Sequence, residues 1–122
     1  MELPLKPVHW IGDSLKELRR LPSPVKQEIG FALHRAQEGK KHSSAKPLRG
    51  FSGADMLEVV ENHAGDTYRA VYTVKFPGAI YVLHVFQKKA KTGIATPKQE
   101  IDLIKARLYL AQQHYIKTGG RP

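Results

Sequence analysis

Residues 56–87, MLEVVENHAGDTYRAVYTVKFPGAIYVLHVFQ, decide the fold class of this chain. They contain three runs rich in β-branched and aromatic residues, which are typical of strands. The runs extend from Met56 to Glu61, from Thr67 to Phe76 and from Ala79 to Gln87. Only short turn sequences separate them, at residues 63–66 and 77–78. Short connections join antiparallel neighbours, so the segment predicts a three-stranded meander. The last run is apolar on both faces, which is typical of a strand covered on both sides.

Helical patterns precede and follow this meander. Val8 to Ile11 is expected to be an edge strand. Three helix starts are then predicted from cap-like residues, at Ser14, at Ser23-Pro24 and at Thr96-Pro97. The first helix stops at Pro22, the second at Gly39 and the third at Gly119-Gly120. The expected buried stripes are Leu15, Leu18 and Leu21; Val25, Ile29, Ala32, Leu33 and Ala36; and Ile101, Ile104, Leu108, Ala111 and Tyr115.

The order of elements is therefore β-α-α-β-β-β-α, which predicts an α+β fold. We expect a small, mostly antiparallel sheet, an N-terminal helical hairpin and a C-terminal helix, with the helices covering one face of the sheet. Residues 40–53 are polar and basic and are expected to form a surface loop. A chain of 122 residues suits one domain, assigned to residues 1–118, with 119–122 as a flexible tail.

The charge balance points to a polyanionic partner. Twenty Lys and Arg residues face eleven Asp and Glu residues, a net charge of +9. No acidic residue occurs between Asp66 and Glu100. That span contains Arg69, Lys75, Lys88, Lys89, Lys91 and Lys98, and a second cluster contains Lys40, Lys41, Lys46 and Arg49. Two such clusters beside a predicted sheet indicate a surface that follows a phosphate backbone.

The composition excludes several classes of protein. Cysteine is absent, which excludes disulfides and thiolate metal sites. No apolar run approaches the roughly 20 residues that cross a bilayer, so we expect a cytoplasmic protein without a membrane partner. The six histidines are isolated from one another, and no nucleotide-binding glycine motif or nucleophile elbow occurs. We therefore expect no metal site and no cofactor.

The remaining cations, histidine and carboxylates suit metal-independent RNA cleavage. The RNA 2′-hydroxyl is its own nucleophile, so the protein needs proton-transfer groups and cations for the charged phosphorane. Arg69 lies mid-strand, and two hypotheses stand for it: an ion pair with Glu58 or Glu61, or a guanidinium presented to phosphate. Glu58, on the adjacent strand, is either a base or the partner of Arg69.

His84 lies inside an apolar strand and is either a core histidine or a proton-transfer group. His84, Phe86 and Lys88 share one face of that strand by alternation. Phe86 either packs in the core or stacks against a base. Lys88, Lys89 and Lys91 leave the sheet at a strand end, where a group of cations favours phosphate binding.

These residues also carry a resemblance to a known family. The sequence resembles the RelE/ParE toxin superfamily, on its HigB-like, phage-derived branch. The matching stretches are 46–50, Glu58, 68–72, 79–89 and 96–101, which read KPLRG, E, YRAVY, AIYVLHVFQKK and TPKQEI. The pattern His-x-Phe-x-Lys-Lys followed by Thr-Pro-x-x-Glu-Ile is specific to this branch.

The resemblance implies the toxin of a type II toxin-antitoxin system, an endoribonuclease (mRNA interferase) that cleaves mRNA, usually on the ribosome. It implies a cognate antitoxin of helix-turn-helix type and contact with operator DNA only through that complex. Catalytic roles are carried over to Arg69, His84, Lys88 and Glu58. The expected RNA-binding residues are Lys46, Arg49, Phe86, Lys89, Lys91 and Lys98.

One feature departs from the family. Several relatives carry a catalytic Tyr or His near the C-terminus, whereas His114-Tyr115 falls at the end of the last predicted helix. The general acid is therefore not assigned. The superfamily also includes gyrase inhibitors, so a non-nucleolytic toxin of that kind and a basic nucleic-acid-binding module remain the alternatives.

Overall fold

The computed structural model describes residues 4–88 and 96–120 and confirms the α+β class. Along the chain, the elements are β1 (Val8–Trp10), α1 (Ser14–Arg19), α2 (Ser23–Gln37), β2 (Ala45–Pro47), β3 (Met56–His63), β4 (Asp66–Thr73), β5 (Ile80–Lys88) and α3 (Lys98–Lys117). Within the described residues, no helix is both long enough and apolar enough to span a bilayer.

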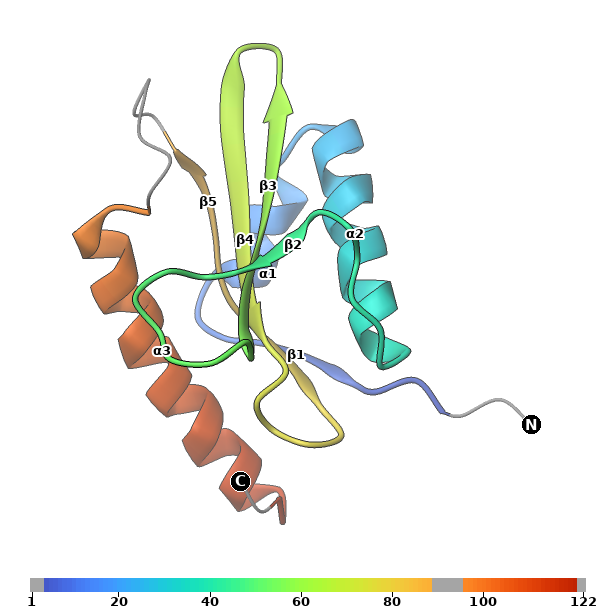
Figure 1. Cartoon of the computed structure of the whole chain (residues 1–122), viewed down its shortest axis with the longest axis vertical. Coiled ribbons are helices and arrows are strands. Elements are labelled where there is room, and N and C mark those ends of the chain that lie inside the picture. Colours follow the sequence, from blue (N-terminus) through green and yellow to red (C-terminus); the bar gives the residue numbers. More distant parts are fainter. Residues whose placement is uncertain (1–3, 89–95, 121–122) are drawn as a thin grey trace.

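The strands form one sheet in the order β1-β5-β4-β3-β2 (Figure 1). The predicted meander is confirmed, because β3, β4 and β5 pair in antiparallel fashion. Ala64 and Gly65 form the two-residue loop between β3 and β4, and both have positive φ angles, 52° and 86°. Such a loop matches the twist of the strands it joins. The edge strand β1 pairs with β5 in parallel, with Val8 opposite Ile80.

The segment expected to be a loop contains an additional strand. β2 pairs with β3 at the edge of the sheet, and Lys46 lies opposite Glu58. The strand has only three residues, two of them exposed, and it ends in Pro47. An edge strand of this composition has no apolar alternation, which is why its sequence resembles a loop. The prediction of a loop at residues 45–47 was therefore wrong.

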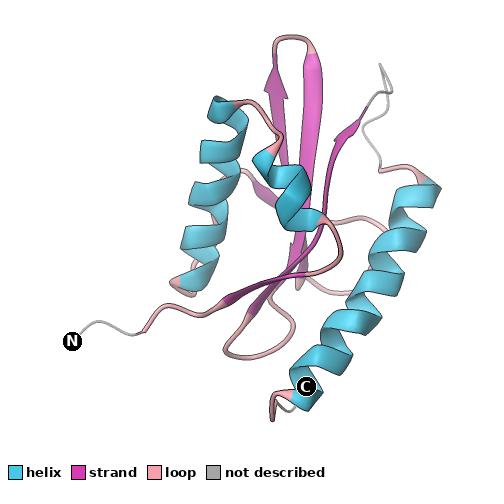
Figure 2. Ribbon diagram, turned by 180° about the vertical axis from the view of Figure 1, so that it is seen from behind, coloured by secondary structure: helices cyan, strands magenta, loops and turns pink. Residues whose placement is uncertain are grey.

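The helices cover both faces of the sheet, not one face as expected (Figures 1 and 2). α1 and α2 pack on one face in a cluster that includes Ile29, Val59 and Val82. α3 packs on the opposite face, in a second cluster that includes Val71 and Ile104. The apolar character of β5 on both faces has its physical reason here, because each face meets a helix.

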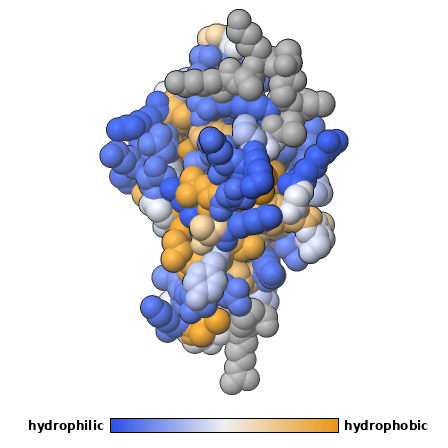
Figure 3. Space-filling model, turned by 90° about the vertical axis from the view of Figure 1, so that its left-hand side faces the viewer, coloured by the Kyte–Doolittle hydropathy of each residue, from blue (hydrophilic) through white to orange (hydrophobic). Residues whose placement is uncertain are grey.

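The predicted buried stripes are confirmed where the helices are longest. All five expected positions of α2 are buried, and Ile104, Ala111 and Tyr115 of α3 are buried as well. α3 also exposes a second set of large apolar side chains, namely Leu103, Tyr109, Leu110 and Ile116. Figure 3 shows apolar side chains exposed among hydrophilic ones on the side of the molecule that α3 covers.

The predicted helix caps were wrong. Asp13, Pro22 and Pro97 occupy the N-cap positions, and none of their side chains caps a helix. Ser14 is fully buried, and its hydroxyl donates a hydrogen bond to the Val82 carbonyl at 3.2 Å. That bond joins α1 to β5, so tertiary packing decides the use of this hydroxyl.

A β-bulge in β5 determines which side chains reach the α3 face. Val71 lies opposite His84 while Tyr72 lies opposite Val82, so Leu83 is an extra residue in β5. With strict alternation, His84 would share the face of Val82, against α1 and α2. The bulge reverses the alternation and turns His84 and the following even-numbered residues toward α3.

Candidate active site

A hollow of about 290 Å³ opens on the α3 face of the sheet. Its lining comes from β2, β3, β4, the loop after β2 and a residue two positions before α3. The lining residues are Lys46, Pro47, Leu48, Arg49, Glu58, Val60, Arg69 and Thr96, and we name this concavity the Arg69 hollow. It brings together four residues that the sequence singled out: Lys46, Arg49, Glu58 and Arg69.

Arg69 is the buried cation of this hollow. Its side chain is 4% exposed, and Nη1 donates hydrogen bonds to Glu58 Oε2 at 2.9 Å and to Thr96 Oγ1 at 3.4 Å. Thr96 Oγ1 in turn donates to the same Glu58 oxygen at 3.3 Å. The expected ion pair of Arg69 is therefore present, and its partner is Glu58. These contacts fix the position of the guanidinium, which is the fork-shaped donor that suits a phosphate.

Lys88 is a second buried cation beside Arg69. It ends β5 opposite Thr67 and is 6% exposed. Burial lowers the pKa of Lys88, the positive charge of Arg69 lowers it further, and Glu58 opposes this shift in part. Two cations and one carboxylate thus act on one another within a small volume. Such an arrangement of positive charge matches the charge that develops on a phosphorane.

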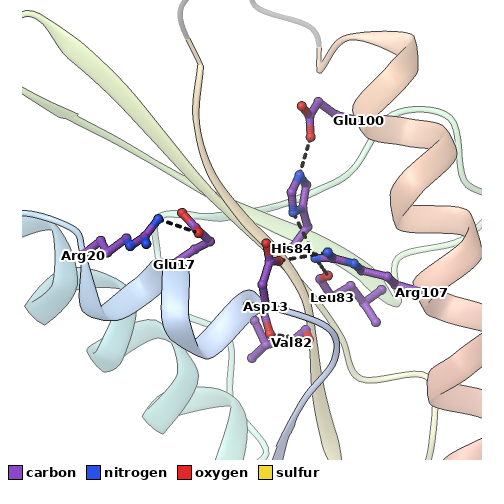
Figure 4. A network of polar contacts seen from close by, with 9 residues as sticks. Asp13, Glu17, Arg20, Val82, Leu83, His84, Glu100 and Arg107 are labelled. Atoms are coloured by element: carbon purple, nitrogen blue, oxygen red, sulfur yellow. Dashed lines mark hydrogen bonds and ion pairs between the residues drawn. The ribbon is translucent and has the colours of Figure 1, made fainter.

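His84 lies two residues before Phe86 on β5, and the two rings stack with centroids 4.5 Å apart and an interplanar angle of 17°. His84 Nε2 contacts Glu100 Oε2, at the start of α3. On the other side of the ring, Arg107 Nη1 lies 3.2 Å from Nδ1. His84 is only 7% exposed, and both of its nitrogens have partners (Figure 4).

Arg107 connects this histidine to the N-terminal part of the chain. Its Nη1 also donates to the Leu83 carbonyl at 3.0 Å, and its Nη2 donates to Asp13 Oδ1 at 2.9 Å. Partial burial raises the pKa of Asp13, but the hydrogen bond and positive charge of Arg107 outweigh it, so this pKa lies below its usual value. We name Asp13, His84, Glu100 and Arg107 the His84 network.

The other predicted RNA-binding residues have different positions. Lys46 and Arg49 are exposed at the rim of the Arg69 hollow. The side chain of Lys98 is 88% exposed, forms an ion pair with Asp102 at 3.1 Å and does not line the hollow. The predictions for Lys89 and Lys91 lie outside the described residues.

His114 and Tyr115 lie away from this site. The Tyr81 hydroxyl and His114 Nδ1 are 2.7 Å apart, and the Tyr115 hydroxyl donates to the Pro77 carbonyl at 2.6 Å. Thr96 precedes α3, so roughly 25 Å of helix separates it from Tyr115. These two residues stabilise the far end of the fold.

Sequence reasoning missed Thr96, Glu100 and Arg107 as site residues. Thr96 was predicted to be a helix cap, but its hydroxyl instead accepts a hydrogen bond from Arg69 and donates one to Glu58. The stretch Thr-Pro-x-x-Glu-Ile at residues 96–101, which resembles the family, was the available signal for Thr96 and Glu100. Among the residues that the structure describes, no group of three or more potential metal ligands occurs.

Comparisons with known proteins identify the family and the fold of the chain. The family model described as phage-derived protein Gp49-like (DUF891) matches residues 16–109. A mutant of the toxin RelE from E. coli, solved in the free state, superposes with a TM-score of 0.50, at 24% identity over 66% of this chain and 81% of that chain. The toxin-antitoxin complex RelBE2 from Mycobacterium tuberculosis gives a TM-score of 0.45, at 16% identity over 74% of this chain and 98% of that chain. No curated protein matches the chain.

The family model covers most of the chain, and the RelE structure shares its fold. The resemblance expected from residues 46–101 is thereby confirmed at the level of family and fold. The chain belongs to the Gp49-like family of phage-derived proteins and has the fold of the RelE toxins.

Proposed function

We propose that this chain is the toxin of a type II toxin-antitoxin system and acts as an endoribonuclease on mRNA. The observation that carries the proposal is the pair of buried cations, Arg69 and Lys88, beside a solvent-accessible hollow. Buried cations are costly for a fold unless they are compensated. Arg69 lines the concave surface and Lys88 adds positive charge next to Arg69, which supports a role in binding and stabilising phosphate charge.

The chemistry needs no group beyond the chain and the RNA. A 2′-hydroxyl loses its proton to a base, and its oxygen forms a bond to the adjacent phosphorus. The bond from phosphorus to the 5′-oxygen breaks, and that oxygen takes up a proton. The products are a 2′,3′-cyclic phosphate and a 5′-hydroxyl.

The charged residues of the hollow, and Lys88 next to Arg69, have proposed parts in this reaction. Arg69 holds the non-bridging oxygens of the phosphorane, and Glu58 keeps its guanidinium in place. Lys88 adds positive charge, and its lowered pKa makes its ammonium a better proton donor for the 5′-oxygen. The exposed Lys46 and Arg49 contact the flanking phosphates from the rim.

The partners follow from the same proposal. An mRNA, presented on the ribosome, occupies the Arg69 hollow. A cognate antitoxin of helix-turn-helix type neutralises the toxin, and operator DNA is reached only through that complex. The net charge of +9 supports a polyanionic substrate.

The test is expression of the chain alone, with transcripts mapped by primer extension and gyrase supercoiling measured in parallel. We expect growth arrest and mRNAs shortened inside their reading frames, and loss of both with Arg69→Ala. Arrest with intact transcripts and inhibited supercoiling would instead identify a gyrase inhibitor. Growth arrest with intact transcripts and normal supercoiling would support the remaining alternative, a basic nucleic-acid-binding protein.

A further inference from the structure

The tautomer of His84 follows from the donors that surround it. Arg107 Nη1 has only hydrogens to offer, so the Nδ1 atom that it approaches at 3.2 Å must present a lone pair. The ring proton is therefore on Nε2, which faces Glu100 Oε2. A carboxylate accepts that proton as a hydrogen bond. Both nitrogens of His84 are thus committed to the protein, Nδ1 to Arg107 and Nε2 to Glu100.

This state removes His84 from direct proton transfer. A proton from the RNA has no free ring nitrogen to reach, because Arg107 and Glu100 occupy both, and only 9% of the side chain is exposed. A histidine that is held by hydrogen bonds at both nitrogens can position the side chains it contacts, here Glu100 and Arg107.

Glu100 both contacts the His84 ring and reaches solvent. Its side chain is 32% exposed, compared with 9% for His84 and 13% for Glu58. Glu58 Oε2 already accepts hydrogen bonds from Arg69 and Thr96. Glu100 is therefore the more accessible carboxylate of the two.

Two structural links connect Glu100 to residues of the Arg69 hollow. Phe86 lies directly opposite Arg69 on β4 and stacks against His84, which contacts Glu100. Thr96, which lines the hollow and accepts a hydrogen bond from Arg69, precedes Glu100 by four residues at the start of α3.

We propose that Glu100 is the proton acceptor for the RNA 2′-hydroxyl and that His84 and Arg107 are the positioning residues that aim it. Glu100 takes the proton as the bond from the 2′-oxygen to phosphorus forms. The 5′-oxygen leaves with a proton from Lys88, and water restores both groups. The inference rests on the proposed nuclease function and assigns its base.

The experiment measures single-turnover cleavage of an mRNA presented on the ribosome as a function of pH. Glu100→Gln should lower the rate by about 10²–10³ and remove the acidic limb of the profile. His84→Gln should retain the rate to within about tenfold, because an amide N–H replaces Nε2–H. Asp102→Asn is the matched control, since this α3 carboxylate bonds Lys98 on the exposed side and should leave the rate unchanged.

The opposite pattern overturns the inference. If His84→Gln abolishes cleavage while Glu100→Gln retains it, His84 itself transfers the proton. If Glu58→Gln removes the acidic limb and Glu100→Gln leaves it, the base is Glu58. Absence of cleavage by the unmodified chain refutes the proposed function itself, which is a distinct result.

A second readout does not depend on activity. In ¹⁵N-histidine-labelled protein, the His84 ring should give the signals of an Nδ1 that accepts a hydrogen bond and an Nε2 that carries a proton. Arg107→Met should change the Nδ1 signal, because the donor to that nitrogen is removed. A His84 that carries its proton on Nδ1 in the unmodified protein contradicts the positioning role.

Discussion

Arg69 and Glu58 form their ion pair diagonally across two strands, with 2.9 Å between Nη1 and Oε2. Glu58 lies directly opposite Val71, and Arg69 lies directly opposite Val60. The diagonal reach brings both charged groups to the same side of the sheet, at the floor of the Arg69 hollow. The two hypotheses for Arg69, an ion pair and a phosphate-binding group, are therefore compatible.

The first prediction separates these two roles by a double-mutant cycle. Arg69→Ala alone should lower the free energy of unfolding by roughly 3–5 kcal/mol, because it leaves Glu58 partly buried without its guanidinium. The double variant Arg69→Gln with Glu58→Gln should lose much less of this free energy, since two amides can hydrogen-bond each other. Urea unfolding measures the free energy of unfolding of both variants. The double variant should still fail to cleave RNA, and a double variant that cleaves would exclude Arg69 from catalysis.

The second prediction concerns Lys88. Because the pKa of Lys88 is lowered in the folded protein, the unfolded chain binds its proton more tightly, and charged Lys88 costs stability at neutral pH. Lys88→Met should therefore raise the melting temperature while lowering the cleavage rate. The stability gap between variant and parent should narrow as the pH rises toward about 10.4, the ordinary pKa of lysine. Lys75→Met, an exposed lysine just after β4, is the control and should show no such gap.

Local sequence predicted the elements well where periodicity was long. Ile29 and Leu33 marked the buried side of α2, and the run from Ala79 to Gln87 marked β5. The bulge at Leu83 was not predictable, because the strand is apolar on both faces and has no alternation that a bulge would interrupt. Since the bulge decides which face His84 occupies, the side of the sheet on which it lies required the structure.

The sequence also did not predict the long-range polar contacts of the His84 network. Glu100 and Arg107 reach His84 across 16 and 23 residues, and Asp13 reaches Arg107 across 94. Local secondary-structure propensities cannot predict such pairs, because the pairs depend on how α3 packs on the sheet. By contrast, an ion pair of Arg69 with Glu58 or Glu61 was one of the two hypotheses drawn from the sequence, because adjacent strands of a meander restrict the possible partners.

The third prediction concerns Tyr72, whose side chain is fully buried between the sheet and α1 and α2. Burial raises its pKa to about 12, and within the described residues its hydroxyl has no hydrogen-bond partner. Tyr72→Phe should therefore raise the free energy of unfolding by about 1 kcal/mol. Tyr81→Phe is the matched control, because that hydroxyl bonds His114 at 2.7 Å and its removal should cost stability. Destabilisation by Tyr72→Phe would reveal a partner for its hydroxyl, such as a buried water.

The fourth prediction concerns pH and His9. Its ring lies 4.8 Å from that of His114 and 4.9 Å from that of Tyr81, measured between centroids. Burial lowers the pKa of His9, and the positive charge of His114 lowers it further. As the pH falls below about 6.5, the ordinary value for histidine, the unfolded chain takes up a proton that the folded chain resists.

The stability contributed by neutral His9 is therefore present above that pH and is lost as the pH falls toward the folded pKa. His9→Gln should flatten the dependence of the melting temperature on pH in this window. His34→Gln, an exposed histidine of α2, should leave it as in the parent. Equal slopes for the parent and His9→Gln would contradict the assignment.

The fifth prediction tests the His84 network through a glycine. Gly12 has a φ angle of +60°, and a Cβ atom there would lie 2.8 Å from Arg107 Cζ. Gly39 has a φ angle of +81°, and a Cβ atom there would meet nothing within 4 Å. Alanine at either position has a similar backbone cost, about 1–2 kcal/mol. Only Gly12→Ala also pushes the guanidinium away from His84 and Asp13.

We therefore expect the two variants to lose similar stability and to differ in function. Gly12→Ala should change the histidine signals of His84 and lower the cleavage rate, because an arginine side chain moves at little cost while its hydrogen bonds depend on direction. Gly39→Ala should change neither. If both variants cleave RNA equally and leave the His84 signals unchanged, the contact between Arg107 and His84 does not set the tautomer. If both lose activity in proportion to stability, the effect of Gly12→Ala comes from the backbone and not from Arg107.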